Sequence, residues 1–179
     1  MRKPISKQSK VVSFRSLVEE SDKGCVIIIG SILEETLRQL HEAHIAANTH
    51  PNEAKIFKEL VRVHAPLSTF AGVIQIAYAY GLFSYNDFRD LEIIRRLRNE
   101  AAHCVWDFSL RDSGVQNMVM LLSAASRQRI NPSIEKNAAP KNDAPNSPKL
   151  TEAKRHLIQN GLALLDIIQK SLQMRSNVI

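Results

Sequence analysis

Arg98 and His103, which lie on one predicted helix, are the side chains whose types could carry out chemistry. A histidine can transfer a proton near neutral pH, and a guanidinium can stabilise negative charge that develops during a reaction. Arg95 and Asn99 lie beside them in the run from Phe88 to His103. We therefore treat Arg95, Arg98, Asn99 and His103 as candidates for a functional cleft.

Arg98 is unusual because it falls among apolar residues on the helical wheel. At about 100° per residue, Arg98 lies at about 280° from Phe88, inside an apolar arc from about 180° to about 320°. The apolar members of this arc are Leu91, Ile94, Leu97, Ala101, Ala102 and Val105. Burying an unpaired guanidinium is costly, so Arg98 must meet a carboxylate, carbonyl groups at a helix end, or a polar cleft.

Two interpretations of this arginine stay open. In the first, Arg98 ties helices together inside the bundle, Asn99 is exposed, and His103 lies near the helix C-terminus, where the dipole favours a cation. In the second, Arg98, Asn99 and His103 line a functional cleft. Arg98 and His103 are about 140° apart on the helix, with Cα atoms about 8–9 Å apart. They would converge only at the helix end or across a symmetric dimer.

The elements that position these residues are predicted to be helices throughout. Apolar residues recur at helical spacing, which predicts an all-α, single-domain helical bundle of five to seven helices. Ser84 is the predicted N-cap of the helix ending at His103, and Gly81 suits the turn before it. The other predicted helices cover 11–20, 21–48, 52–63, a segment capped by Ser68 or Thr69, 112–127, and a last helix capped by Thr151.

The domain organisation follows from charge and proline content. Residues 1–10 are predicted to be a basic disordered arm, and residues 11–129 the bundle. Residues 130–150, which contain four prolines, are predicted to be a flexible linker, and 151–175 a C-terminal helix that packs on the bundle. The net charge of +6 comes from residues 1–15 and 127–149, because the rest of the chain has slightly more acids than bases. The arm could therefore contact nucleic acid weakly.

Several classes of function find no support in the sequence. The longest apolar run, Cys25–Ile29, is far shorter than the roughly 20 residues of a membrane span, and no signal-peptide pattern is present. The two cysteines, Cys25 and Cys104, are predicted to be buried thiols in a reducing cytoplasm. No metal-ligand spacing, phosphate loop or nucleophile motif appears, so we expect no metal and no cofactor.

Two further residue groups bear on function. Trp106 follows the central helix, and we expect it to anchor the core. A helix-turn-helix around Gly81 is disfavoured, because its second helix would present Asp87, Asp90 and Glu92 to DNA phosphates.

The sequence resembles the mannitol operon repressor family. The resemblance rests on PLSTF at 66–70, IQIAYAYGL at 74–82, and the stretch from Tyr85 to His103, and helix order extends it loosely over 21–175. It implies an all-helical, non-enzymatic protein that acts in transcriptional regulation, mainly through protein–protein binding. The chain departs from the family pattern after His103, and the segment 130–150 is peculiar to it.

A shorter resemblance points to a different class. Arg98, Asn99 and His103 match the R-polar-x-x-x-H motif of HEPN-type ribonucleases, in which two subunits assemble a metal-free RNA-cleaving site. That reading makes Arg98 and His103 catalytic and predicts a homodimer; a monomer with Arg98 held by an internal carboxylate such as Glu35 would argue against it. An immunity protein against a nuclease toxin is the third alternative.

Overall fold

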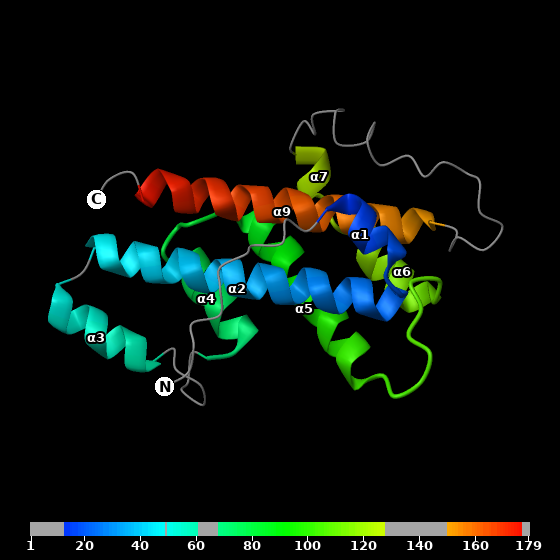
Figure 1. Ribbon diagram of the computed structural model, residues 1–179, viewed down its shortest axis with the longest axis horizontal. Coiled ribbons are helices and arrows are strands. Elements are labelled where there is room, and N and C mark those ends of the chain that lie inside the picture. Colours follow the sequence, from blue (N-terminus) through cyan, green and yellow to red (C-terminus); the bar gives the residue numbers. More distant parts are fainter. Residues whose placement is uncertain (1–12, 49, 61–67, 128–149, 177–179) are drawn as a thin grey trace.

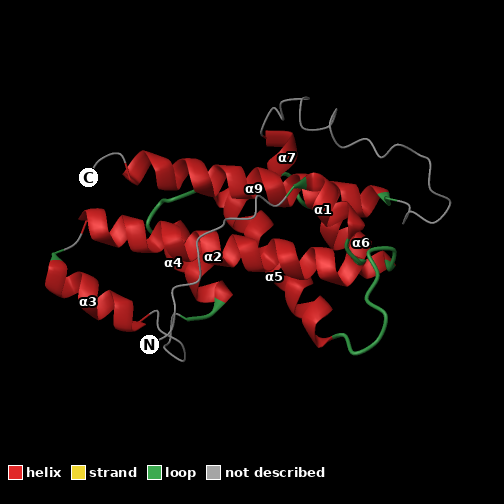
Figure 2. Cartoon of the chain, viewed as in Figure 1, coloured by secondary structure: helices red, strands yellow, loops and turns green. Residues whose placement is uncertain are grey.

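The computed structural model describes residues 13–48, 50–60, 68–127 and 150–176, and these form helices joined by loops, with no strand among them (Figures 1 and 2). The predicted all-α fold is confirmed. Among the described residues, six helices have eight residues or more, within the predicted five to seven. The long helices are α2 (Asp22–Asn48), α3 (Pro51–Leu60), α4 (Phe70–Ala79), α5 (Tyr85–His103), α6 (Ser113–Met120) and α9 (Glu152–Ser176), and the short ones are α1 (Phe14–Glu19) and α7 (Ala124–Arg127).

Helices α2 and α9 form the centre of the molecule and lie side by side (Figure 1). Their facing apolar residues, together with those of α5, are fully buried, which removes a large apolar area from water. The two helices touch closely at Gly161, where an added Cβ would lie 2.7 Å from Ile29 Cγ2. Lys154 of α9 is buried and donates hydrogen bonds to the backbone oxygens of Val18 and Glu20, so α9 also holds the junction of α1 and α2.

Helix α5 begins where the sequence predicts. Ser84 Oγ accepts a hydrogen bond from Asp87 N, and Asp87 Oδ2 accepts one from Ser84 N at 3.1 Å, which completes a capping box. The turn before α5 contains Gly81 with φ of 66°, a left-handed conformation that favours glycine. Thr69 caps α4 by accepting a hydrogen bond from Gly72 N at 3.1 Å. These caps fix where α4 and α5 begin.

The structure differs from the predicted elements in a few places. The predicted helix 112–127 is divided into α6 and α7 by residues 121–123, because Asp90 of α5 accepts a hydrogen bond from Ser123 N and holds the chain in a turn there. The arm 1–10 and nearly all of the linker lie outside the described residues. Leu150, the last residue of the predicted linker, packs against the core. No helix in the described part of the chain is long and apolar enough to cross a bilayer.

The two cysteines differ in environment. Cys25 is fully buried in α2, and this burial raises the pKa of its thiol to about 12. Cys104, predicted to be buried in a helix, instead ends α5 and is half-buried, with Sγ 3.3 Å from the backbone oxygen of Trp106. Thiol reagents attack the thiolate, so Cys25 is protected by both its pKa and its burial.

We therefore expect the native protein to consume one equivalent of Ellman's reagent quickly and the second only on unfolding. Absorbance at neutral to mildly alkaline pH measures the two phases. The variant Cys104→Ser should lack the fast phase. Two equally fast phases in the native protein would contradict the buried position of Cys25.

Candidate functional site

Arg98 lies between α2 and α5 and is held by a carboxylate. Its Nη2 lies 3.3 Å from Glu34 Oε2 of α2, and its side chain is 31% exposed. Of the three kinds of partner that the sequence leaves open for this guanidinium, the structure shows a carboxylate. Glu35, the partner suggested by the sequence, is exposed and instead accepts a hydrogen bond from Gln39 at 3.0 Å. The physical reason is register, because a shift of one residue turns a helical side chain by about 100°.

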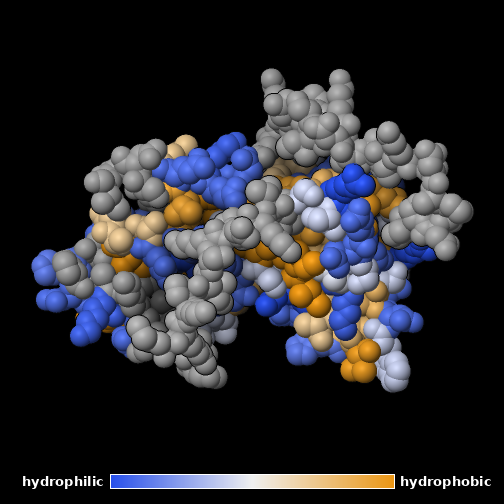
Figure 3. Space-filling view, in the orientation of Figure 1, coloured by the Kyte–Doolittle hydropathy of each residue, from blue (hydrophilic) through white to orange (hydrophobic). Residues whose placement is uncertain are grey.

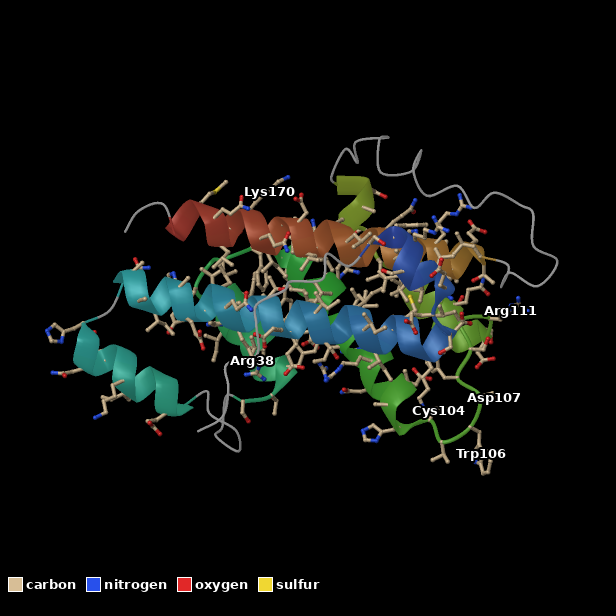
Figure 4. All side chains as sticks on the ribbon, in the orientation of Figure 1. Arg38, Cys104, Trp106, Asp107, Arg111 and Lys170 are labelled. Atoms are coloured by element: carbon tan, nitrogen blue, oxygen red, sulfur yellow. The ribbon has the colours of Figure 1, made fainter. Side chains whose placement is uncertain are left out.

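Glu34 forms ion pairs with two arginines. Arg38, one turn further along α2, places Nη2 2.7 Å from Glu34 Oε1 and also donates to the backbone oxygen of Ser68, next to the start of α4. Figure 4 shows Arg38 extending from α2. The side chain of Glu34 is only 18% exposed, so its charge is poorly screened by water. One carboxylate therefore joins α2, α5 and the entrance to α4.

The aliphatic part of the Arg98 side chain is also closely packed. A Cβ built on Gly30 would lie 2.8 Å from Arg98 Cδ, so the arginine stem lies directly against the α2 backbone. The guanidinium carbon is 5.9 Å from the centre of the buried Phe70 ring, within the range of a cation–π contact. Arg98 thus acts as a cross-link between α2, α4 and α5.

The other candidate residues are placed differently. Arg95 is half-buried and makes two hydrogen bonds to Glu92 of its own helix, at 3.1 and 2.8 Å, and these raise its pKa above the ordinary value. Asn99 and His103 are exposed. No hydrogen bond or ion pair joins Arg98 to His103 in the described part of the chain. The structure therefore brings Arg98 to Glu34 and not to His103.

Two of the acids that would face phosphates in a helix-turn-helix, Asp87 and Asp90, point inward instead. Asp87 is 7% exposed and belongs to the capping box, and Asp90 is 2% exposed and accepts a hydrogen bond from Ser123 N at 3.1 Å. Glu92 is half-buried and paired with Arg95. The helix is rich in acids by composition, but the fold uses most of them internally.

Trp106 is not a core anchor, and this prediction is wrong. Its side chain is 84% exposed and that of Val105 is 82% exposed, and Figure 4 shows Trp106 on the loop after α5, pointing away from the helices. Hydrophobic atoms reach the surface at the same corner of the space-filling view (Figure 3). The core is completed here by Phe108 and Leu110, which are buried.

The loop that carries Trp106 is anchored at both ends. Lys23 Nζ donates to the backbone oxygen of Cys104 at 2.7 Å, and Asp22 Oδ2 accepts a hydrogen bond from Leu110 N at 3.0 Å. Both anchors come from the first turn of α2. The two anchors therefore keep Val105 and Trp106 exposed to water and prevent the loop from turning them into the core.

A second exposed apolar group lies at the other end of α5. Tyr78 of α4 and Tyr85 of α5 are 39% and 59% exposed. The ring of Phe88 lies 4.9 Å from that of Tyr78 and 6.2 Å from that of Tyr85, measured between centroids. We call Tyr78, Tyr85 and Phe88 the aromatic cluster.

The histidines on α2 do not form a metal site with their neighbours. His41 is buried, with Nε2 2.9 Å from the backbone oxygen of Val73, and burial lowers its pKa below the ordinary value. In the described ranges, no group of three His, Cys, Asp or Glu side chains is arranged to hold a metal ion.

Sequence reasoning missed Glu34, Arg38 and the exposure of Trp106. A signal for the first two exists, because Glu34 and Arg38 are four residues apart on one helix, the spacing of a helical ion pair. For Trp106 there is no such signal. A lone tryptophan after a helix fits both a core and a surface position, and the loop anchors come from residues about 80 positions away.

The comparisons with known proteins concern the fold. No family model and no curated protein matches the sequence. Among solved structures, a chain of the X-ray structure of the MtlR–HPr complex from Escherichia coli matches with a TM-score of 0.56 and 15% identity, over 85% of this chain and 90% of that chain. The chain thus has a fold similar to that of a mannitol repressor, which is the fold that the sequence resemblance implies.

Proposed function

We propose that this chain is a non-enzymatic regulatory protein of the cytoplasm that acts in transcriptional regulation mainly by binding another protein. The observation that carries the proposal is the exposed pair Val105 and Trp106 on an anchored loop. Burying a tryptophan contributes strongly to protein association, and tryptophan is enriched among the residues that dominate interface energies. A rigid loop also loses little conformational freedom on binding.

The fold likeness supports the same class of function. The similar chain belongs to a structure in which MtlR is bound to HPr, so a bundle of this kind is compatible with a protein partner. At this level of similarity the likeness is an analogy of fold, and the partner must be tested directly. HPr from the organism that encodes this chain is the first partner to test.

The ribonuclease alternative is not favoured by the position of Arg98. In that mechanism the guanidinium stabilises negative charge on the reacting phosphate, but here it is paired with Glu34 and packed against Gly30. His103 lies on the exposed side of the helix and makes no contact with Arg98 among the described residues. If Arg98 moved to a phosphate, Glu34 would keep only its ion pair with Arg38, and the contacts of Arg98 that connect α2, α4 and α5 would be lost.

We expect Trp106→Ala to weaken binding to HPr by about 30-fold, corresponding to about 2 kcal/mol for loss of an interface anchor. Isothermal titration calorimetry of purified full chains measures the change. The matched control is Met174→Ala, which removes an apolar side chain that is 71% exposed on α9, and it should leave binding unchanged.

Three outcomes would count against the proposal. If wild type and Trp106→Ala bind HPr equally, the loop is not the anchor. If HPr does not bind, capture from lysate with both variants decides between another regulator partner and a nuclease, and a captured nuclease would support the immunity-protein alternative. RNA cleavage by wild type that is lost in His103→Ala would support the ribonuclease.

A further inference from the structure

The exposed side of α5 carries a row of residues spaced like one edge of a coiled coil. We define the α5 outer face as Tyr85, Arg89, Arg96, Asn99 and His103, all of which are exposed. With Glu92 between them, these positions follow spacings of four, three, four, three and four residues along the helix. This alternation keeps side chains on one line along a helix, so the face is complementary to a second straight helix.

The outer face is basic because most acidic side chains of α5 are buried or paired with an arginine. The carboxylates of Asp87 and Asp90 are buried and accept hydrogen bonds from Ser84 N and Ser123 N, and Glu92 is neutralised by Arg95. Arg89 and Arg96 have no ion pair within the described ranges. They are seven residues apart, or about 10 Å along the helix axis. Glu100 at the edge of the face is the exposed acid of this helix.

An apolar anchor lies at one end of the basic row. Tyr85 begins the outer face and belongs to the aromatic cluster with Tyr78 and Phe88, whose rings pack at centroid distances of 4.9 to 6.2 Å. Tyrosine and arginine are both enriched among interface hot spots. The face thus offers an aromatic contact followed by two positive charges.

The chain itself does not supply a complement to this face. The segments outside the described residues are basic or neutral: 1–12 and 61–67 contain no acid, and in 128–149 the bases outnumber the two acids. A second copy joined through the same face would bring two patches of the same net positive charge together, since a two-fold interface uses the same patch of both copies. Like charges in contact oppose association. The occupant is therefore a different molecule with negative charge.

We infer that the α5 outer face docks an acidic amphipathic helix of a protein partner. Carboxylates at seven-residue spacing on that helix pair with Arg89 and Arg96, and an apolar side chain contacts the aromatic cluster. This inference rests on the proposed function, and it names the surface and the chemistry of the partner. The seven-residue spacing of the arginines matches two turns of a partner helix.

A nucleic acid fits the same face less well. Protein surfaces that bind nucleic acid derive most of their affinity from many contacts to phosphates. This face has two arginines, and the carboxylates of Glu92 and Glu100 beside them would repel phosphates. The described residues together contain about as many acids as bases, so they provide no broad positive field to attract phosphate.

The test uses the full chain and a synthetic probe. The probe is a fluorescein-labelled three-heptad helical peptide with glutamate at every seventh position and one leucine row, followed by fluorescence anisotropy at low salt. Arg89→Glu combined with Arg96→Glu should weaken binding at least tenfold, and a peptide with lysine in place of glutamate should bind this variant better than wild type. The matched control, Lys55→Glu with Arg155→Glu, makes the same charge change at exposed positions on α3 and α9 and should bind like wild type.

Three results would overturn the inference: equal binding to wild type and the α5 variant, equal binding of a scrambled peptide, or tighter binding of random-sequence duplex DNA through the same two arginines. Because the probe is synthetic, this assay is independent of the natural partner. If HPr or another protein binds through Trp106 while the peptide fails, the proposed function stands and this surface is wrong. If the peptide behaves as expected and no natural partner is found, the docking surface stands and the proposed function is wrong.

Discussion

Replacing Glu34 by glutamine is expected to lower the free energy of unfolding by about 2 kcal/mol. The carboxylate of Glu34 lies 2.7 Å from Arg38 and 3.3 Å from Arg98, and no other carboxylate contacts either guanidinium among the described residues. Glutamine has nearly the same shape but no charge, so the two half-buried cations would repel each other across it. Urea unfolding followed by circular dichroism measures the loss.

The neighbouring glutamate provides the matched control. Glu35 is exposed and accepts a hydrogen bond from Gln39 one turn away on the same helix, so Glu35→Gln should change stability by less than about 0.5 kcal/mol. Adding Arg98→Met to Glu34→Gln should recover part of the loss, because it removes one of the two cations and keeps an apolar stem. Equal stabilities for the Glu34 and Glu35 variants would show that the network does not join the helices.

Gly161→Ala is expected to destabilise the protein by about 1–3 kcal/mol through overpacking. The added methyl group would lie 2.7 Å from Ile29 Cγ2, a separation that real Cβ atoms essentially never show. That carbon is bonded directly to Cβ of Ile29, so it moves only if the whole side chain rotates or if α2 and α9 separate. Thermal and urea unfolding report the change.

The control for this variant is another helical glycine. Gly114 in α6 has no atom within 4 Å of an added Cβ, so Gly114→Ala should be neutral or stabilising by up to about 1 kcal/mol, as helix propensity predicts. The same substitution thus has opposite expected signs at the two sites. A stabilised Gly161→Ala variant would mean that α2 and α9 are not in close contact there.

The fold was predictable because its signals are local. The start of α5 follows from Ser84 and Asp87, and the turn before it follows from Gly81, all within a few residues of the feature that they determine. The division of 112–127 into two helices was not predictable. It depends on Asp90, whose carboxylate reaches Ser123 from another helix, and no spacing rule within 112–127 contains that information.

The candidate site was predictable in part. Helical periodicity alone places Arg98 among apolar residues and requires a partner for it, but it cannot choose between Glu34 and Glu35, which differ only by a rotation about α2. Periodicity does indicate which acids of α5 are used internally, because Asp90 at about 200° and Asp87 at about 260° from Phe88 fall inside the apolar arc. It cannot supply the partner of Asp90, which is Ser123 on another segment. Exposure of Trp106 likewise depends on the loop anchors from α2.

The pairing of α2 with α9 has a consequence for biosynthesis. A ribosome makes residues 22–48 early and residues 152–176 more than a hundred positions later, yet each helix covers the apolar side of the other. During translation the part of α2 that contacts α9, including the buried Ile29, has no permanent cover until α9 emerges. Nascent chains of this protein should therefore bind chaperones until α9 has been made, and release should coincide with the emergence of α9.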